Sequence, residues 1–219
     1  MKLNESRGNM YSFITHTGNA IKGRCYHDCS YCYMKKWGKQ KKIRLEKSEL
    51  KGDIGTGKFI FIGSSCDMFA PDIKEEWILD TLEYLRQFDN RYMFQSKSPK
   101  QIVNFTQNLP PKSVVCTTIE TNIWFPKIMG KSPTPQERAE GMDMLHGIEK
   151  YVTIEPVMVF DLEPLVELIE KCDPVQVNIG ADSGGNHLPE PKKDDVLQLI
   201  SELEKFTKVK QKSNLKRLL

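Results

Sequence analysis

Long apolar segments are missing from this sequence of 219 residues. Its longest uninterrupted apolar stretches, such as 59–62 and 157–160, are far shorter than the roughly 18 residues that a membrane-spanning helix needs. Residues 1–11 also lack the apolar core of a secretory signal. We therefore expect no membrane association and a cytoplasmic location, where thiols stay reduced. The six cysteines are accordingly interpreted as ligands or core residues before disulfides.

Internal repeats, low-complexity tracts and linkers rich in Gly, Ser or Pro are also missing. This predicts one domain over residues 1–219, ending in a basic tail at about 205–219 that contains six Lys or Arg and no acid. Hydrophobic residues make up 39% and charged residues 28% of the chain, which excludes a disordered or fibrous protein. The net charge of +3 is small, so only local charge clusters are expected to matter.

Strand-like and helix-like segments alternate along the chain. Short β-branched or aromatic runs, bounded by turn residues, predict strands at 58–63, 92–95, 113–120, 151–159 and 175–180, with a weaker one near 11–15. Apolar residues at helical spacing predict helices over 74–88, 99–108, 134–146, 162–171 and 194–205. Continuous alternation favours an α/β fold with a parallel sheet. Six units in this length predict a partial (β/α)6 TIM-like barrel, with chemistry in the loops after the strands.

Three cysteines, Cys25, Cys29 and Cys32, lie within eight residues ahead of the second predicted strand. Four thiolates occupy every iron of a cubane cluster, whereas three leave one iron open to another ligand. The alternative is a structural zinc site with His27 as the fourth ligand, although His27 would then fold back between two cysteines onto the same metal. A disulfide with one spare thiol is a weaker alternative in a reducing compartment.

The pattern Cys-x-x-x-Cys-x-aromatic-Cys, with Tyr31 as the aromatic residue, resembles the cluster loop of the radical S-adenosylmethionine (SAM) superfamily. This resemblance implies a 4Fe-4S cluster on Cys25, Cys29 and Cys32 whose open iron binds SAM. It further implies reductive cleavage of SAM to a 5'-deoxyadenosyl radical, which abstracts hydrogen from a substrate. An electron donor of the flavodoxin or ferredoxin type is implied as a partner.

Further landmarks resemble those of a phage-associated family of small radical SAM proteins. They occur in order at 19–33, 63–69, 96–99, 118–122, Arg138, 155–156 and 180–184. The last landmark of that family usually reads Gly-Gly-Glu-Ser-Gly, whereas this chain has Gly-Ala-Asp-Ser-Gly, so the role of Asp182 is open.

The core also resembles the spore photoproduct lyase family. Tyr31 and Tyr33 match aromatic positions around its last cluster cysteine. The turn containing Cys66 and the end of the next strand at Lys97 match two further positions. The resemblance implies that Cys66 returns a hydrogen atom to the product radical and that Lys97 contacts the SAM carboxylate.

The loops after the second and third predicted strands contain the next candidate residues. Ser64, Ser65 and Asp67 supply oxygens for the methionine ammonium group, which offers only donors. An ordinary polar turn is the alternative. For Cys66 the alternative is a small buried core residue, and for Lys97 it is a solvated surface lysine.

Polar residues also end the fourth and fifth predicted strands. Thr118, Glu120 and Asn122 alternate on one face, where they are placed to bind ribose hydroxyls. Glu155 lies in an apolar strand and must find hydrogen bonds or stay protonated. We expect it at the SAM or substrate pocket, or alternatively in a structural salt bridge with Arg138.

Two features bear on the substrate. The segment 35–51 contains eight Lys or Arg against two Glu, and clustered lysines attract polyanions. Trp37 and Trp124 are placed to stack on a base, or belong to the core or a lid. One hypothesis is therefore a nucleic-acid or nucleotide-linked substrate. The other hypotheses are a small metabolite or peptide substrate with solubilising lysines, and a non-enzymatic zinc-binding domain.

Overall fold

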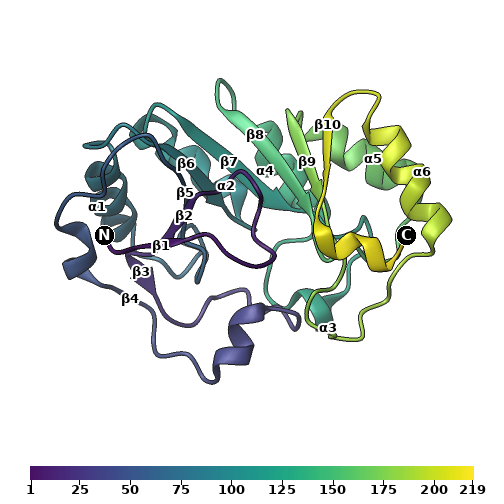
Figure 1. Ribbon diagram of the computed structural model, residues 1–219, viewed down its shortest axis with the longest axis horizontal. Helices are drawn as coiled ribbons and strands as arrows, with labels where there is room; N and C mark the ends of the chain where they lie inside the picture. Colours follow the sequence, from purple (N-terminus) through teal and green to yellow (C-terminus); the bar gives the residue numbers. More distant parts are fainter.

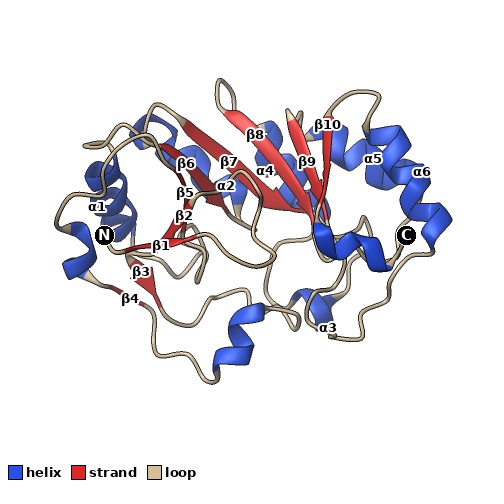
Figure 2. Ribbon diagram, viewed as in Figure 1, coloured by secondary structure: helices blue, strands red, loops and turns tan.

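The computed structural model describes residues 1–219, and its central feature is an eight-stranded sheet (Figures 1 and 2). The strands follow the order β1-β2-β5-β6-β7-β8-β9-β10, and every neighbouring pair is parallel except β1 with β2. Its strands are β1 Leu3–Glu5, β2 His16–Gly18, β5 Phe59–Ile62, β6 Arg91–Gln95, β7 Ser113–Thr118, β8 Glu149–Ile154, β9 Gln176–Ile179 and β10 Lys208–Gln211. A separate two-stranded ladder pairs β3 Ile21–Lys22 with β4 Arg44–Leu45.

Helices follow the strands and pack outside the sheet. The α-helices are α1 Glu75–Leu85, α2 Pro99–Ile102, α3 Pro126–Met129, α4 Pro135–Asp143, α5 Leu162–Lys171 and α6 Lys193–Leu203. The short 3₁₀ helices are η1 Tyr33–Trp37, η2 Lys47–Leu50, η3 Val103–Asn108 and η4 Ser213–Arg217. The apolar stripes of α1, α5 and α6 pack against the sheet in one core. This core contains Leu82, Leu165 and Leu199 of the helices and Val115 and Val177 of the strands. This burial supplies the main driving force for folding.

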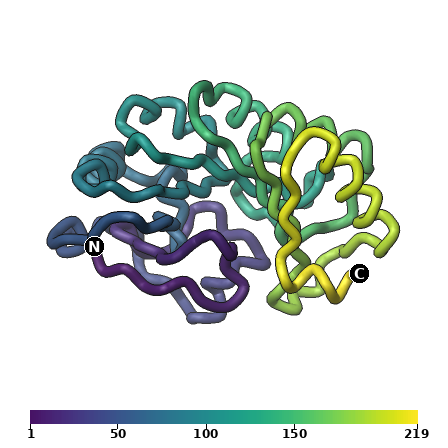
Figure 3. The backbone as a smooth tube through the Cα atoms, turned by 45° about the horizontal axis from the view of Figure 1, so that its top comes forward, coloured from purple at the N-terminus to yellow at the C-terminus, as the bar shows by residue number.

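The other face of the sheet is covered by the N-terminal segment. Tyr11 and Ile14 pack there against Phe61, Met93 and Tyr151 in a second core. Figure 3 shows this segment lying beside the C-terminal segment, and the Lys212 ammonium lies 4.5 Å from the centre of the Tyr11 ring. The predicted strand at 11–15 is therefore wrong, because these side chains fill the inside of the barrel and the strand begins only at His16.

The predicted partial (β/α)6 TIM-like barrel in a single domain is confirmed. The five stronger predicted strands all exist, although the one predicted over 151–159 ends at Ile154, before Pro156, whose ring nitrogen has no hydrogen to continue the ladder. The helix predicted over 99–108 is divided into α2 and η3. Part of the predicted basic tail forms β10, a seventh parallel strand, and the sheet stays open between β10 and β1. No helix has the length and apolar character needed to cross a membrane.

The contact between α2 and α4 generates a test of this packing. A Cβ at Gly141 of α4 would lie 2.6 Å from the backbone nitrogen of Lys100 and 3.0 Å from Cγ of Pro99. Gly141→Ala should therefore destabilise the protein by about 1–3 kcal/mol, the usual cost of overpacking, although alanine normally favours a helix. Urea unfolding measures this, with Ser201→Ala on the exposed face of α6 as the control. An increase in stability for Gly141→Ala would show that the two helices are not packed so closely.

Candidate functional site

The three cysteines lie on one excursion of the chain at the carboxyl edge of the sheet. The ladder of β3 and β4 closes this excursion, and we call residues 23–32 the cysteine loop. The Cys29 side chain is buried, whereas Cys25 and Cys32 are half-buried, and all three thiols are free. Tertiary contacts therefore have to hold this loop in place.

Backbone contacts fix the cysteine loop against the segment around α3. The Lys131 amide donates to the His27 carbonyl at 2.7 Å, and the Ser30 amide donates to the Ile128 carbonyl at 2.8 Å. Gly130 has a φ of +64° and lies so close to the loop that a Cβ there would overlap the His27 carbonyl. Only glycine combines this backbone conformation with so close an approach. Glycine at position 130 therefore allows the cysteine loop to pack against the segment around α3.

A buried carboxylate joins the same loop to the ends of β5 and β6. Asp67 Oδ2 accepts from His27 Nε2 at 2.8 Å, from Ser96 Oγ at 2.9 Å and from the Lys97 amide at 2.9 Å. Its Oδ1 accepts from the Phe69 amide at 3.0 Å. Burial alone would raise the pKa of Asp67, but the hydrogen bond and charge of His27 lower it below the ordinary value. The predicted acceptor for a methionine ammonium is thus already occupied by four protein donors.

His27 itself is only 2% exposed. Burial lowers its pKa, but the hydrogen bond and charge of Asp67 raise it above the ordinary value. No group of three His, Cys, Asp or Glu side chains is arranged to hold one metal ion.

Cys66 lies next to the cysteine loop. Its side chain is 3% exposed, and its S–H donates to the Asp67 carbonyl at 3.8 Å. The neighbouring Cys66 thiol lowers the pKa of the Cys25 thiol to about 6, and Cys25 together with burial raises the pKa of Cys66 above its ordinary value. The structure thus brings the predicted hydrogen donor to one of the predicted cluster ligands.

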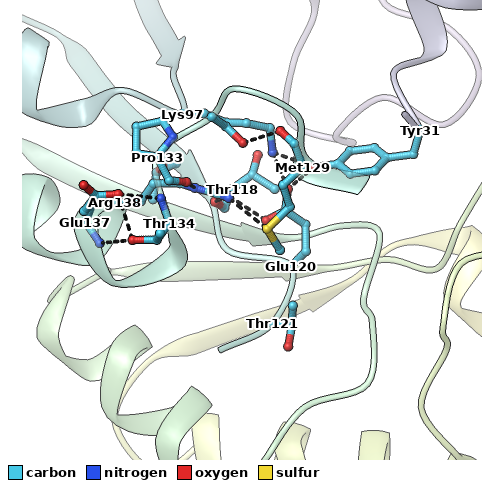
Figure 4. A network of polar contacts seen from close by, with 12 residues as sticks. Tyr31, Lys97, Thr118, Glu120, Thr121, Met129, Pro133, Thr134, Glu137 and Arg138 are labelled. Carbon is cyan, nitrogen blue, oxygen red and sulfur yellow. Dashed lines mark hydrogen bonds and ion pairs between the residues drawn. The ribbon is translucent and has the colours of Figure 1, made fainter. Parts of the chain in front are cut away.

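Four charged or polar side chains form a buried network on the inner side of the cysteine loop (Figure 4). Tyr31 Oη donates to Glu120 Oε1 and accepts from Lys97 Nζ at 2.8 Å. Lys97 Nζ also forms an ion pair with Glu120 Oε1. Arg138 Nη1 donates to Glu120 Oε2 at 2.6 Å and to the Thr118 carbonyl at 2.6 Å. The loop, β6, β7 and α4 therefore meet at Glu120.

The charge of Glu120 is set by these neighbours. Burial alone would raise its pKa, but Arg138 and Lys97 lower it from 4.5 to about 2. Arg138 is fully buried, and its Nε donates to the Pro133 carbonyl at 2.8 Å. A capping box between Thr134 and Glu137 starts α4 and thereby positions Arg138.

Ser64 and Ser65 lie together at the end of β5 and share one partner. Asn19 Oδ1 accepts from the Ser65 amide and from Ser65 Oγ, both at 2.9 Å, and Asn19 Nδ2 donates to Ser64 Oγ at 3.0 Å. Tyr33, which is 50% exposed, donates from its hydroxyl to the Ser64 carbonyl. Asn19, the first residue of the landmark at 19–33 but not one of the predicted site residues, fixes this turn from the end of β2.

Thr118, Glu120 and Asn122, which were predicted to alternate on one face, have different partners in the structure. Thr118 Oγ1 accepts from Gln95 Nε2 at 2.9 Å. Asn122 instead bonds to Asp161, accepting from its amide at 2.9 Å and donating to its carboxylate at 3.1 Å. The chain leaves the strand after Thr118, so strand alternation no longer applies to the two later residues.

Glu155 is held by a separate network that joins both ends of the chain. Its Oε1 accepts from Asn9 Nδ2 at 2.7 Å and from Asn214 Nδ2 at 2.9 Å, and its Oε2 pairs with Lys212 Nζ at 2.5 Å. The alternative salt bridge between Glu155 and Arg138 is wrong, because Arg138 pairs with Glu120. The partners of Glu155 could not be predicted from the sequence, because Asn9, Lys212 and Asn214 lie far from it along the chain.

Among known proteins, only solved structures gave matches to this chain, and they share its fold. No family model and no curated protein matches the sequence. Among solved structures, the chain resembles a point variant of spore photoproduct lyase with a TM-score of 0.68 and 12% identity, over 95% of this chain and 78% of that one. A variant with bound S-adenosylmethionine and dinucleoside spore photoproduct gives a TM-score of 0.59 at 12% identity, over 91% of this chain and 64% of that one.

A third structure, spore photoproduct lyase complexed with dinucleoside spore photoproduct, gives a TM-score of 0.58 at 12% identity, over 94% of this chain and 64% of that one. At such low identity these matches establish a shared fold, which is the partial barrel predicted from the sequence. They do not test the resemblance to the phage-associated family.

The Glu120 network generates a stability test. Since its pKa is lowered in the folded state, the charge of Glu120 stabilises the fold above pH 4.5, and this contribution is lost as the pH falls towards 2. Arg138→Met leaves a buried charge short of a partner, which should cost about 3–5 kcal/mol at pH 7. The loss of unfolding free energy should be smaller at pH 5 than at pH 7. Without Arg138, burial raises the pKa of Glu120 and favours its protonated form at the lower pH.

Urea unfolding at both pH values measures the deficit. The double variant Arg138→Met with Glu120→Gln is the control, and it should recover part of the loss because the fully buried carboxylate is removed, while the Lys97 ammonium keeps some contact with water. Equal deficits at both pH values and in the double variant would contradict the ionic role given to Glu120.

Proposed function

We propose that the protein is a radical SAM enzyme. The observation that carries this proposal is the juxtaposition of a three-cysteine loop with the Lys97–Glu120 pair at the carboxyl edge of a partial barrel. Ligand sites of such barrels gather at that edge. The fold similarity to spore photoproduct lyase, of which one structure contains S-adenosylmethionine, supports the proposal.

In this proposal Cys25, Cys29 and Cys32 hold a 4Fe-4S cluster with one open iron. When bound and reduced by an external donor, the cluster would cleave SAM to methionine and a 5'-deoxyadenosyl radical able to remove a hydrogen atom from the substrate. The protein positions both groups and keeps water away from the radical. Asp67 serves as a positioning residue, because it fixes His27 of the cysteine loop and the Lys97 amide with one carboxylate oxygen.

Lys97 is the proposed partner of the SAM carboxylate. An ammonium group has three hydrogens to donate, and Lys97 Nζ uses two of them, on Tyr31 and Glu120. The third has no protein partner and is available to a carboxylate. Ser64 and Ser65 remain the proposed neighbours of the methionine ammonium group, with Tyr33 beside them.

The remaining predicted cofactor residues have separate proposed roles. Tyr31 and Glu120 hold Lys97 in place, and Thr118 supports Arg138 through its carbonyl. Asn122, which faces Asp161, and Glu155, in its own network, are proposed to border the substrate rather than SAM.

The proposed substrate is a nucleic acid or a nucleotide-linked group. The dinucleoside complexes of spore photoproduct lyase and the lysine-rich segment after the cysteine loop support this choice. A small metabolite or a peptide is the second candidate. A flavodoxin or ferredoxin-type donor is the proposed source of the electron, and the proposed location is the cytoplasm.

Anaerobic reconstitution tests the cluster. The wild-type chain should bind about four iron and four sulfide ions, and replacing Cys25, Cys29 or Cys32 with Ala should abolish this. Cys172→Ala is the matched control, because Cys172 is fully buried in the core beside α5 and bonds the Leu168 carbonyl at 3.2 Å. Reduced wild-type protein with SAM should release 5'-deoxyadenosine. Zinc without sulfide in anaerobically purified protein would instead select the zinc-binding domain.

Cys66→Ala tests whether Cys66 is a hydrogen donor or a cluster ligand. If Cys66 donates hydrogen to the substrate radical, the variant keeps its iron and sulfide and releases 5'-deoxyadenosine at a rate within about threefold of wild type. Its substrate product should change, because the radical is no longer quenched by this thiol. Loss of iron from Cys66→Ala would make Cys66 a ligand, and an unchanged product would remove the donor role.

A further inference from the structure

The chain after the cysteine loop forms a second element of the same excursion. We call residues 33–42 the basic arm. The Lys35 amide donates to the Cys32 carbonyl at 3.0 Å, and the Arg24 amide donates to the Lys41 carbonyl at 2.8 Å. Gly23 packs closely enough that a Cβ there would lie 2.7 Å from Cα of Ile43. The arm is therefore fixed at both ends to the cysteine loop.

The charge of the basic arm is concentrated and largely unpaired. Five of its ten residues are lysine and none is acidic, whereas the net charge of the whole chain is only +3. Lys35 pairs with Asp28 of the cysteine loop at 3.1 Å. The other four lysines are exposed and form no salt bridge, namely Lys36, Lys39, Lys41 and Lys42.

Exposed aromatic side chains accompany these lysines. Trp37 in the arm is 77% exposed and Tyr33 is 50% exposed. In the segment on the opposite flank of the cysteine loop, Trp124 is 37% exposed, and Lys127 and Lys131 are also exposed. In Figure 1, the unlabelled short helix η1, drawn in blue-purple, and α3 lie along the lower edge of the molecule.

The two flanks are joined through the cysteine loop. Lys35 Nζ contacts Asp28 on one side, and the Ser30 amide bonds the Ile128 carbonyl on the other. A ligand that spans Trp37 and Trp124 therefore crosses the loop that contains the cysteines. Separated cations attract a chain of phosphates, and flat exposed indoles offer stacking surfaces for unpaired bases. A duplex hides its base faces and uses only the lysines.

We infer that the basic arm and the Trp124 flank form a binding surface for single-stranded nucleic acid across the cysteine loop. This inference rests on the proposed function only in the purpose given to the surface, which is to bring a base to the site of radical formation. Binding itself requires only the folded chain. The same surface can accept DNA or RNA, since both present phosphates and unstacked bases.

Fluorescence anisotropy with labelled single strands of about 15 nucleotides, one DNA and one RNA, tests the inference on reconstituted protein. The variant Lys36→Glu/Lys39→Glu/Lys41→Glu/Lys42→Glu should bind at least tenfold more weakly at low salt. Its plot of log affinity against log salt should be shallower by about 3, because each lost phosphate contact contributes about 0.7. The charge-matched control reverses lysines at the outer helices, Lys74, Lys100, Lys193 and Lys205, and should stay within about threefold of wild type.

Trp37→Ala tests stacking separately from charge. It should weaken single-strand binding by about fivefold or more while leaving the salt dependence unchanged. Phe206→Ala, which removes a 38% exposed aromatic residue elsewhere, is the control and should bind as wild type does. Far-ultraviolet circular dichroism and bound iron confirm that each variant keeps its structure.

Two outcomes would overturn the inference. They are equal oligonucleotide binding by the arm and control variants, and tighter binding of duplex than of single strand. Failure of the proposed function is distinguishable, because it appears as a missing cluster while oligonucleotide binding persists.

Discussion

The hydrogen bonds of Asp67 fix the geometry on which the rest of the site depends. This carboxylate accepts from His27 in the cysteine loop and from Ser96 and the Lys97 amide at the end of β6. A buried carboxylate with four donors stays ionised and rigid, and removing a donor weakens the stabilisation of its charge. The position of the cysteines is thereby set relative to the Lys97 side chain. The fold supplies the sheet edge, and Asp67 ties the loop to it.

Charge is arranged differently on the two sides of the cysteine loop. On the inner side, Glu120 and Arg138 are buried, Lys97 is partly buried and all three are paired, which orients each side chain before any ligand arrives. On the outer side, the lysines of the basic arm are exposed and mostly unpaired. A buried paired charge positions a small ligand with precision, whereas an exposed unpaired cluster attracts a long polyanion. The two arrangements are consistent with the small cofactor proposed for the inside and the single-stranded nucleic acid proposed for the surface.

Sequence patterns predicted the parts of the fold that depend on local periodicity. The strands β5, β6, β7 and β9 and the helices α1 and α5 follow from apolar spacing, because their buried faces repeat regularly. The short polar strand β10 was missed, since only its ladder with β9 defines it. The cysteine loop was identifiable from spacing alone. The partner of Arg138 was not, because long-range pairs depend on how the strand ends meet.

The most direct test of an open iron beside Lys97 is an EPR experiment on the reduced, anaerobically reconstituted protein, with SAM labelled with ¹⁵N at its amino group. If three cysteines hold the cluster and leave one iron free, addition of labelled SAM changes the spectrum and produces hyperfine coupling to the amino nitrogen. Identical spectra with and without SAM, or a cluster whose irons are all bound by protein side chains, would contradict the account.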